Sequence, residues 1–189
     1  MAALKRRTAG LLAAVIALMV GTATTRAAEI GPDQLEFDVK ATFLPKFAAY
    51  VIWPPQALQY PGDPVQLCII GRDPFGSRLD EAAGRQRIGS HPLIVRRIET
   101  TADAQHCHLA FVAGSTKQDI KAALKALAER SILTVTDDRF GPERGIVHFT
   151  LRGGRVRFYI NNLGAAHNEL TISARLLSIA LSVNMKARA

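Results

Sequence analysis

The chain of 189 residues has little of what defines several unusual protein classes. It has two cysteines, 14 glycines and nine prolines, and aromatic residues make up 6% of it. Two cysteines cannot build the disulfide framework of a small scaffold, and the glycine and proline content is too low for a collagen-like or low-complexity chain. At 48% hydrophobic residues the chain is not of the disordered class either. A compact globular domain is therefore expected.

Acidic residues are absent from the first 27 positions, where Lys5, Arg6, Arg7 and Arg26 supply four of the 24 basic residues. Without those four, 20 basic residues stand against 16 acidic ones, which is a net charge of +4. That charge is too low for the dense basic field of a nucleic-acid-binding protein. We therefore expect no nucleic acid among the partners.

The same N-terminal stretch is typical of a secretory signal peptide. Its basic residues precede an apolar run of ten, Leu11–Val20, and small residues follow. Ten helical residues span about 15 Å, half of a hydrocarbon core of roughly 30 Å, so a membrane anchor is not favoured. We predict a cleaved signal peptide over residues 1–27, with cleavage after Ala23 as the alternative. The domain over residues 28–189 is then exported, most simply to a bacterial periplasm.

That compartment decides how Cys68 and Cys107 are interpreted. In the cytosol two such residues are usually buried thiols, but in an oxidising compartment a pair permits one intramolecular bridge. We favour the disulfide. In the chain-entropy model a loop of this length restricts the unfolded state by about 4 kcal/mol.

Apolar periodicity divides the rest of the chain into helices and strands. A helix is predicted over residues 33–50, and Pro45 should kink or break it before Trp53-Pro54-Pro55 prevents its continuation. Asp73 and Ser115 have the positions of N-caps for the next two helices. Those helices are predicted over 74–83 and 115–129, a final helix over 170–186, and strands over 65–70, 93–98, 109–113, 132–136, 146–151 and 156–161.

This order of elements predicts one three-layer α/β domain with a mixed sheet, Rossmann-like or flavodoxin-like, flanked by N-terminal and C-terminal helices. Arg152-Gly153-Gly154-Arg155 is typical of a hairpin turn between the last two strands. The final helix is apolar on most sides, so we expect the sheet and another helix or another chain to cover it.

Residues that could carry chemistry are scattered. The loop over 71–76 leaves a strand and opens a helix, where α/β sheets bind anions, but it lacks a glycine-rich fingerprint, and a capped turn also explains it. His106 and His108 share a strand face without an evident third metal ligand, and no serine-hydrolase motif occurs. Asp137 and Asp138 end a strand, where they could bind a cation or simply begin a turn. We predict no catalytic residue, metal or cofactor.

Arg155 and Arg157 share one face of the last strand with Tyr159, and Arg152 lies on the hairpin. Such a stripe suits an anion or a protein partner, and a solvated sheet face is the alternative interpretation.

Short fragments follow one another in a definite order along the chain: VKATFL with FA (39–48), YVIWP (50–54), CIIGRDPFG (68–76), CHLAFV (107–112), ILTVTD (132–137), GIVHF (145–149), RVRFYIN (155–161) and LLSIA (176–180). Their order and spacing resemble the YfiR-like family of exported bacterial proteins. Cys68 and Cys107 fall where members of that family carry a disulfide. Pro45 and the lack of a second cysteine pair depart from the family pattern.

The resemblance implies a periplasmic regulator and not an enzyme. Such a protein would bind and repress the periplasmic domain of an inner-membrane, YfiN-like diguanylate cyclase, and so lower cyclic di-GMP and biofilm formation. An OmpA-like outer-membrane lipoprotein, YfiB-like, would sequester the repressor. A homodimer formed through a helix face is a further expectation.

A repressor needs a buried apolar interface to hold its target in one state. We expect the aromatic N-terminal segment, the C-terminal helix and the arginine stripe to supply it. The candidates are Phe43, Phe47, Tyr50, Trp53, Arg155, Arg157 and Arg175.

The alternative function is a periplasmic small-ligand-binding module with a cleft at the carboxyl ends of the strands. Arg72, Asp73 and Asp137 would line that cleft. A hydrolase with an unrecognised site is a third and weaker interpretation.

Overall fold

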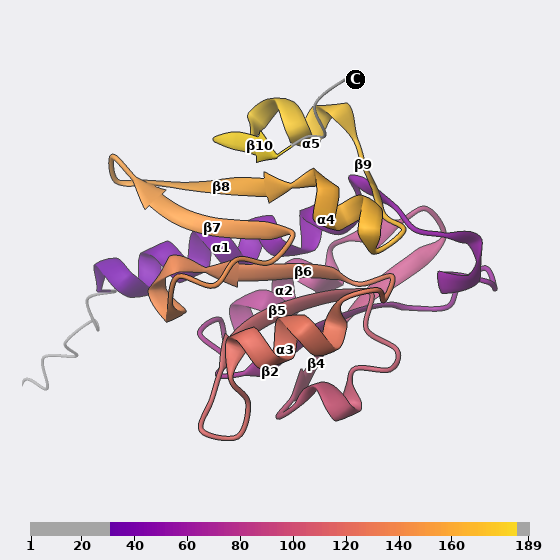
Figure 1. Cartoon of the computed structure of the whole chain (residues 1–189), viewed down its shortest axis with the longest axis horizontal. Coiled ribbons are helices and arrows are strands. Elements are labelled where there is room, and N and C mark those ends of the chain that lie inside the picture. Colours follow the sequence, from indigo (N-terminus) through magenta and orange to yellow (C-terminus); the bar gives the residue numbers. More distant parts are fainter. Residues whose placement is uncertain (1–30, 185–189) are drawn as a thin grey trace, which may run out of the picture.

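Short apolar runs of the chain form one eight-stranded sheet in the computed structural model, which describes residues 31–184. The strands of this sheet are β2 (Val65–Gly71), β3 (Arg87–Ile88), β4 (His91–Ile98), β5 (Leu109–Gly114), β6 (Leu133–Asp137), β7 (Val147–Arg152), β8 (Arg155–Asn161) and β10 (Ser182–Asn184). Their order across the sheet is β10-β8-β7-β6-β5-β2-β4-β3 (Figure 1). The predicted signal peptide, residues 1–27, lies outside the described residues.

The sheet is mixed. Neighbouring strands from β4 through β2, β5 and β6 to β7 are parallel, β8 is antiparallel to β7, and β10 is parallel to β8. A separate two-stranded antiparallel sheet joins β1 (Val51–Ile52) to β9 (Thr171–Ile172). The predicted α/β class with a mixed sheet is confirmed, whereas the closer likeness to Rossmann or flavodoxin folds stays a prediction.

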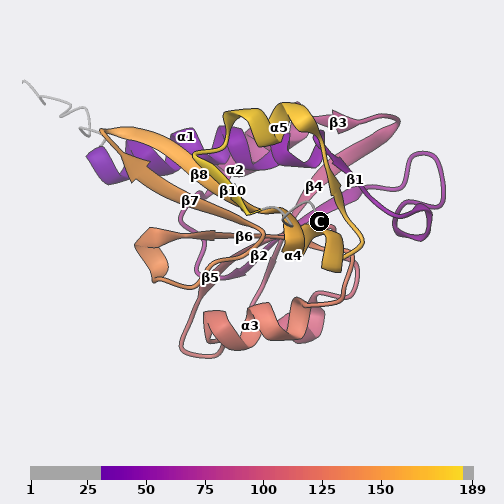
Figure 2. The same cartoon turned by 45° about the horizontal axis from the view of Figure 1, so that its top comes forward.

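Helices cover both faces of the sheet (Figure 2). They are α1 (Pro32–Ala48), α2 (Ser77–Gly84), α3 (Ile120–Leu127), α4 (Asn162–His167) and α5 (Ala174–Ile179), with short 3₁₀ helices η1 (Pro55–Ala57), η2 (Thr101–Asp103) and η3 (Asp138–Phe140). α1 and α2 lie on one face of the sheet and α3 on the other.

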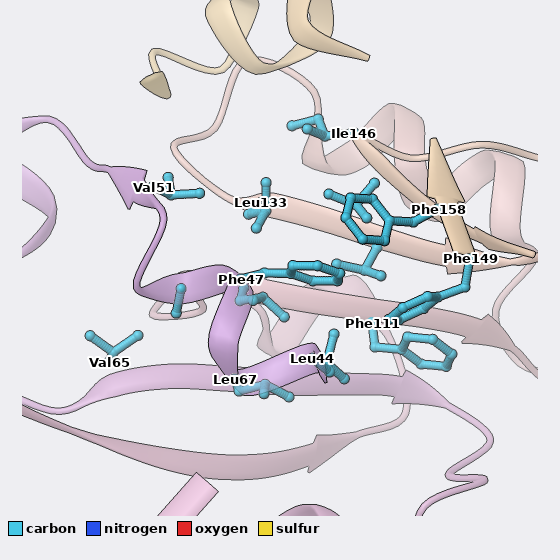
Figure 3. Close-up of a cluster of buried hydrophobic side chains, with 14 of the residues drawn as sticks. Leu44, Phe47, Val51, Val65, Leu67, Phe111, Leu133, Ile146, Phe149 and Phe158 are labelled. Atoms are coloured by element: carbon cyan, nitrogen blue, oxygen red, sulfur yellow. The ribbon is translucent and has the colours of Figure 1, made fainter. Parts of the chain in front are cut away.

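The main core lies between α1 and the sheet, and aromatic rings fill its centre (Figure 3). Phe47 of α1 packs against Phe149 of β7 and Phe158 of β8, with ring centroids 5.4 Å and 5.1 Å apart. Burying one such side chain contributes about 1.5–3 kcal/mol, so these contacts hold α1 on the sheet.

α1 continues through Pro45, so the break expected there does not occur. Pro45 lies in the last turn of the helix and is buried with Leu44, Phe47 and Ala48. A proline costs a helix one amide donor, and core packing around the last turn offsets that loss.

The predicted C-terminal helix over 170–186 is wrong. The chain forms β9, then α5, which Ser173 caps by accepting the Leu176 amide N–H, and then β10. Ala180 is already extended, and Ser182 to Asn184 pair with β8. Strand pairing at the sheet edge therefore overrides the helical periodicity, and residues 185–189 lie outside the described range.

Helices α2 and α3 both begin later than predicted, because the residues expected to cap them form turns instead. The Asp73 carboxylate accepts the Phe75 amide N–H at 2.8 Å, and α2 begins four residues after Asp73 at Ser77. Ser115 likewise accepts the Lys117 amide N–H at 3.1 Å, whereas Asp119 caps α3. Asx and Ser/Thr turns satisfy the same backbone donors as a helix cap does, so the sequence pattern does not separate them.

A second, smaller core lies between the sheet and α3, and it contains the predicted disulfide between Cys68 and Cys107. Their Cα atoms are 5.8 Å apart, and the bridge ties β2 to the segment that enters β5. The disulfide prediction is confirmed.

Replacing both cysteines with serine should lower the free energy of unfolding by about 2–4 kcal/mol, because the unfolded chain regains the freedom that the bridge removes. Urea unfolding measures the change. A reductant should shift the wild-type midpoint and leave that of the double variant unchanged. Equal midpoints for both proteins under oxidising conditions would contradict the prediction.

Candidate functional site

One side of α1 carries apolar residues that remain exposed or half-buried. Leu35, Val39 and Phe43 are spaced by four residues, so they share one face of the helix. Leu35 is 60% exposed, and the other two are half-buried. The same row of residues continues to the buried Phe47, so α1 has one broad apolar surface whose edge, at Leu35 and Val39, is left open.

The β7–β8 hairpin supplies the opposite wall. Leu151 and Val156 are cross-strand partners on the hairpin face that carries Phe149 and Phe158 toward α1. With Leu35 and Val39 they line a hollow of about 590 Å³. The two-residue turn Gly153-Gly154 has positive φ values of 56° and 69°, which a tight hairpin of this kind requires.

A second hollow of about 200 Å³ continues the first, since Val156 lines both. Phe43, Phe158 and Ile179 of α5 border it, and Ile179 is 55% exposed. We call the combined depression the apolar groove, defined by Leu35, Val39, Phe43, Leu151, Val156 and Ile179. A contiguous exposed apolar surface of this kind marks a site for a protein or ligand.

Charged residues close one end of the groove. Arg139 donates to Glu36 at 2.9 Å and also pairs with Asp33, and all three line the larger hollow. Burial would raise the pKa of Glu36, but hydrogen bonds from Arg139 and Lys40 outweigh it and lower that pKa. The charges at this end are therefore neutralised within the protein.

Lys40 lies behind the groove and is completely buried. Its ammonium pairs with Glu36 and lies 2.5 Å from Oδ2 of Asp137, at the carboxyl end of β6. That oxygen makes no further hydrogen bond, while Oδ1 accepts the Arg139 amide N–H at 3.0 Å. Burial raises the pKa of Asp137, and the ammonium of Lys40 opposes the rise. This ion pair fastens α1 to the sheet.

Lys40→Met should destabilise the protein by about 3–5 kcal/mol, because it leaves the carboxylates of Glu36 and Asp137 buried without their cation. Chemical unfolding followed by circular dichroism measures the loss. Lys46→Met is the matched control on the same helix, where the side chain is exposed, and it should leave the midpoint nearly unchanged. Similar midpoints for the two variants would show that the ion pair does not hold α1.

The structure gathers some predicted partner-binding residues and separates others. Phe43, Arg155 and Arg157 border the groove. Phe47 and Trp53 are buried in the core, with exposed fractions of 1% and 8%. Tyr50 is partly exposed beyond the end of α1, and Arg175 is exposed on α5.

Sequence reasoning missed most of the groove, namely Leu35, Val39, Leu151, Val156 and Ile179 as an exposed set. A usable signal was present, because the apolar residues of α1 spread over more of the helix circumference than one core-facing stripe needs. The contribution of the β7–β8 hairpin to the groove could not be predicted, since it depends on how β7 and β8 lie against α1.

The residues of the alternative ligand cleft are engaged elsewhere. Asp73 accepts from Arg97 at 2.7 Å, and Asp137 pairs with Lys40. Arg72 is exposed, with its guanidinium 5.8 Å from the centre of the Phe140 ring. Neither carboxylate keeps its charge available for a ligand.

His108 holds the loop between β1 and β2 in place through two hydrogen bonds of its ring. Its Nδ1 accepts the Gln66 amide N–H at 3.0 Å, and its Nε2 donates to the Ala57 carbonyl at 2.8 Å. This arrangement requires a neutral ring, and burial lowers the pKa of His108. Trp53 lies edge-to-face against it, with ring centroids 6.4 Å apart. His108 is thus structural, and no group of three metal-binding side chains occurs among residues 31–184.

Stability should fall as the pH drops below about 6.5, because the unfolded chain binds a proton there that folded His108 resists. The loss continues until the lowered pKa is reached, and His148, whose pKa burial also lowers, adds to it. Urea unfolding followed by the fluorescence of Trp53, the one tryptophan, measures the slope.

His108→Gln should flatten that slope. His106→Gln, at an exposed neighbour, should keep the wild-type slope. A flat wild-type profile between about pH 7.5 and pH 5.5 would contradict the prediction.

These features define a class of protein: an α/β domain that offers an open apolar groove and uses its buried charged groups for its own fold. None of the helices in the described part of the chain is long and apolar enough to cross a membrane.

The particular family follows from a comparison with family models. The model described as YfiR/HmsC-like matches residues 37–181, which is more than half of the chain. The protein belongs to the YfiR/HmsC-like family, and the resemblance seen in the sequence is confirmed. No curated protein matches the sequence. The family is a regulatory one that is not known to be enzymatic, and it points to periplasmic cyclic di-GMP signalling through protein–protein contact.

Proposed function

We propose that the protein represses an inner-membrane diguanylate cyclase by binding its periplasmic domain in the apolar groove. The observation that carries this proposal is the open apolar edge of α1, which continues onto the β7–β8 hairpin and α5. The family supports a regulatory role. The cyclase as the partner, and the lowering of cyclic di-GMP and biofilm formation, are parts of the proposal.

The groove has enough apolar surface for the task. Moving a cyclase from 99:1 active to 1:99 requires a preference of about 5.5 kcal/mol for the inactive state. Leu35, Leu151 and Ile179 are 60%, 41% and 55% exposed. Fully burying an exposed side chain of this size contributes about 1.5–3 kcal/mol, so these three and their half-buried neighbours can supply most of that preference.

Buried contacts also hold the walls of the groove in a fixed position. The ion pair of Lys40 with Asp137 fixes the helix on β6, and the packing of Phe47 against Phe149 and Phe158 fixes it on the hairpin. A binding surface that is ordered before contact loses less entropy on association.

The same groove explains how the repressor is released. An OmpA-like, YfiB-like outer-membrane lipoprotein that covers Leu35 and Ile179 would compete with the cyclase for one surface. A second copy of the chain bound through α5 would compete in the same way, so a homodimer would be a resting form.

The small-ligand alternative has less support from the geometry. A cleft at the carboxyl ends of the strands would need free polar groups, and Asp73 and Asp137 are neutralised by Arg97 and Lys40.

Leu35→Glu and Ile179→Glu should each weaken binding to the purified periplasmic domain of the cyclase at least tenfold, because each puts a charge into an apolar contact. Both side chains are exposed, so the melting temperature should stay near that of the wild type. Calorimetry measures the affinity. Ile94→Glu is the matched control, since Ile94 is 40% exposed on β4, outside the groove.

In cells, deleting the gene should raise cyclic di-GMP when the cyclase is present, and the two groove variants should fail to restore the low level. Full complementation by Leu35→Glu, or no change in cyclic di-GMP on deletion, would contradict the proposed function.

A further inference from the structure

The β7–β8 hairpin has a second face, which turns away from α1. Phe149 and Phe158 point toward Phe47, and side chains alternate along a strand. The opposite face therefore carries Thr150 with its cross-strand partner Arg157 and, nearer the turn, Arg152 with its partner Arg155.

Arg144, in the loop before β7, joins the same surface. Its guanidinium lies 4.5 Å from the ring centre of Tyr159, which is on this face of β8. Arg152 donates to the Tyr159 hydroxyl at 3.3 Å, so one tyrosine positions two guanidiniums. We call the set Arg144, Arg152, Arg155 and Arg157 the arginine face.

The charge of the arginine face is not balanced within residues 31–184. None of its four arginines forms a salt bridge there, in contrast to Arg97 and Arg139, which each pair with two carboxylates. Asp138 lies near enough to act on Arg152, but its Oδ2 accepts the Thr150 hydroxyl at 2.6 Å.

The arginine face also lowers the stability of the folded chain. Arg152 and Arg155 stand directly opposite each other, and like charges in a cross-strand pair are destabilising. Neither arginine of this pair has a salt bridge within residues 31–184, so an external anion bound between them would relieve their repulsion.

A small hollow of about 190 Å³ lies beside the arginine face, where β10 extends the sheet. Arg144, His148, Tyr159, Asn161 and Ser182 are among its lining residues, so hydrogen-bond donors surround it. Its size suits the end of one acidic side chain.

We propose that the arginine face binds an acidic segment of a partner polypeptide, whose carboxylates pair with the four guanidiniums. Side chains on one face of a strand repeat every 6.5–7 Å or so, a spacing that carboxylates of an extended or helical segment can match. The four guanidiniums belong to the side of the hairpin opposite Leu151 and Val156, although Arg155 and Arg157 also border the apolar groove at its edge. The proposal goes beyond the proposed function, because it adds a charged contact to the apolar one.

Other occupants fit less well. A surface that inserts into a membrane combines basic residues with exposed apolar ones, and no exposed large hydrophobic residue lies on the strand positions of this face. A second copy would bring its own four arginines to the contact. A single small anion would leave most of the four guanidiniums without a partner.

The probe is a fluorescein-labelled octaglutamate peptide, and its binding to the chain without the predicted signal peptide (residues 28–189) is measured by fluorescence anisotropy. We expect binding at low ionic strength that weakens as salt rises. The double variant Arg155→Gln, Arg157→Gln should bind at least tenfold more weakly. Arg85→Gln with Arg87→Gln is the matched control, because both arginines are exposed near β3, and it should stay within twofold of wild type.

A stability measurement separates binding from a structural role. Because Arg155 opposes Arg152, the variant Arg155→Gln should unfold at the same temperature as the wild type or at a higher one. A clearly lower melting temperature together with lost binding would make the arginines structural and overturn the proposal. The groove variant Leu35→Ala adds no charge beside Arg155 and should bind the peptide normally, so the two proposals can fail separately.

Three further results would overturn the proposal. An octalysine peptide could bind as tightly as octaglutamate, inorganic phosphate could displace the peptide at equal charge concentration, or phosphatidylglycerol vesicles could bind the arginine face more tightly than the peptide does. The last two would assign the face to a small anion and to a membrane.

Discussion

The ion pair between Lys40 and Asp137 is the constraint on which the rest of the binding surface depends. It joins the middle of α1 to the carboxyl end of β6, where both side chains are buried and an unpaired charge would be very unfavourable. Because this pair and Phe47 fix α1 on the sheet, the apolar edge of the helix at Leu35 and Val39 can remain open. The exposed groove is thus a consequence of strong internal anchoring and not of loose packing.

The β7–β8 hairpin links the two surfaces of the molecule. One face carries Leu151 and Val156 into the groove, and the other carries the arginines. Strand alternation places apolar and cationic side chains on opposite sides of the hairpin, and the two surfaces meet at its edge, where Arg155 and Arg157 border the groove. A regulator built this way can combine an apolar contact that provides affinity with a charged contact that provides orientation and rate.

Much of the fold could be predicted from the sequence, and the reasons for the failures are physical. Buried strands such as Val65–Gly71 are short apolar runs with clear borders, and the disulfide followed from the compartment. The final helix failed because pairing of Ser182–Asn184 with β8 is a long-range contact that periodicity does not contain. The groove was missed for the same reason: Leu35 looks like a core residue until the position of the sheet is known.

The two-residue turn at Gly153-Gly154 fixes the register of the hairpin, and with it the identity of each face. Inserting one residue into β8 between Gly154 and Phe158 would turn Arg155 and Arg157 toward α1 and Val156 toward solvent. Relatives that keep both surfaces should therefore keep this spacing unchanged, even where the arginines are replaced. Length variation in this part of the family is expected at the tip of the hairpin and not within its strands.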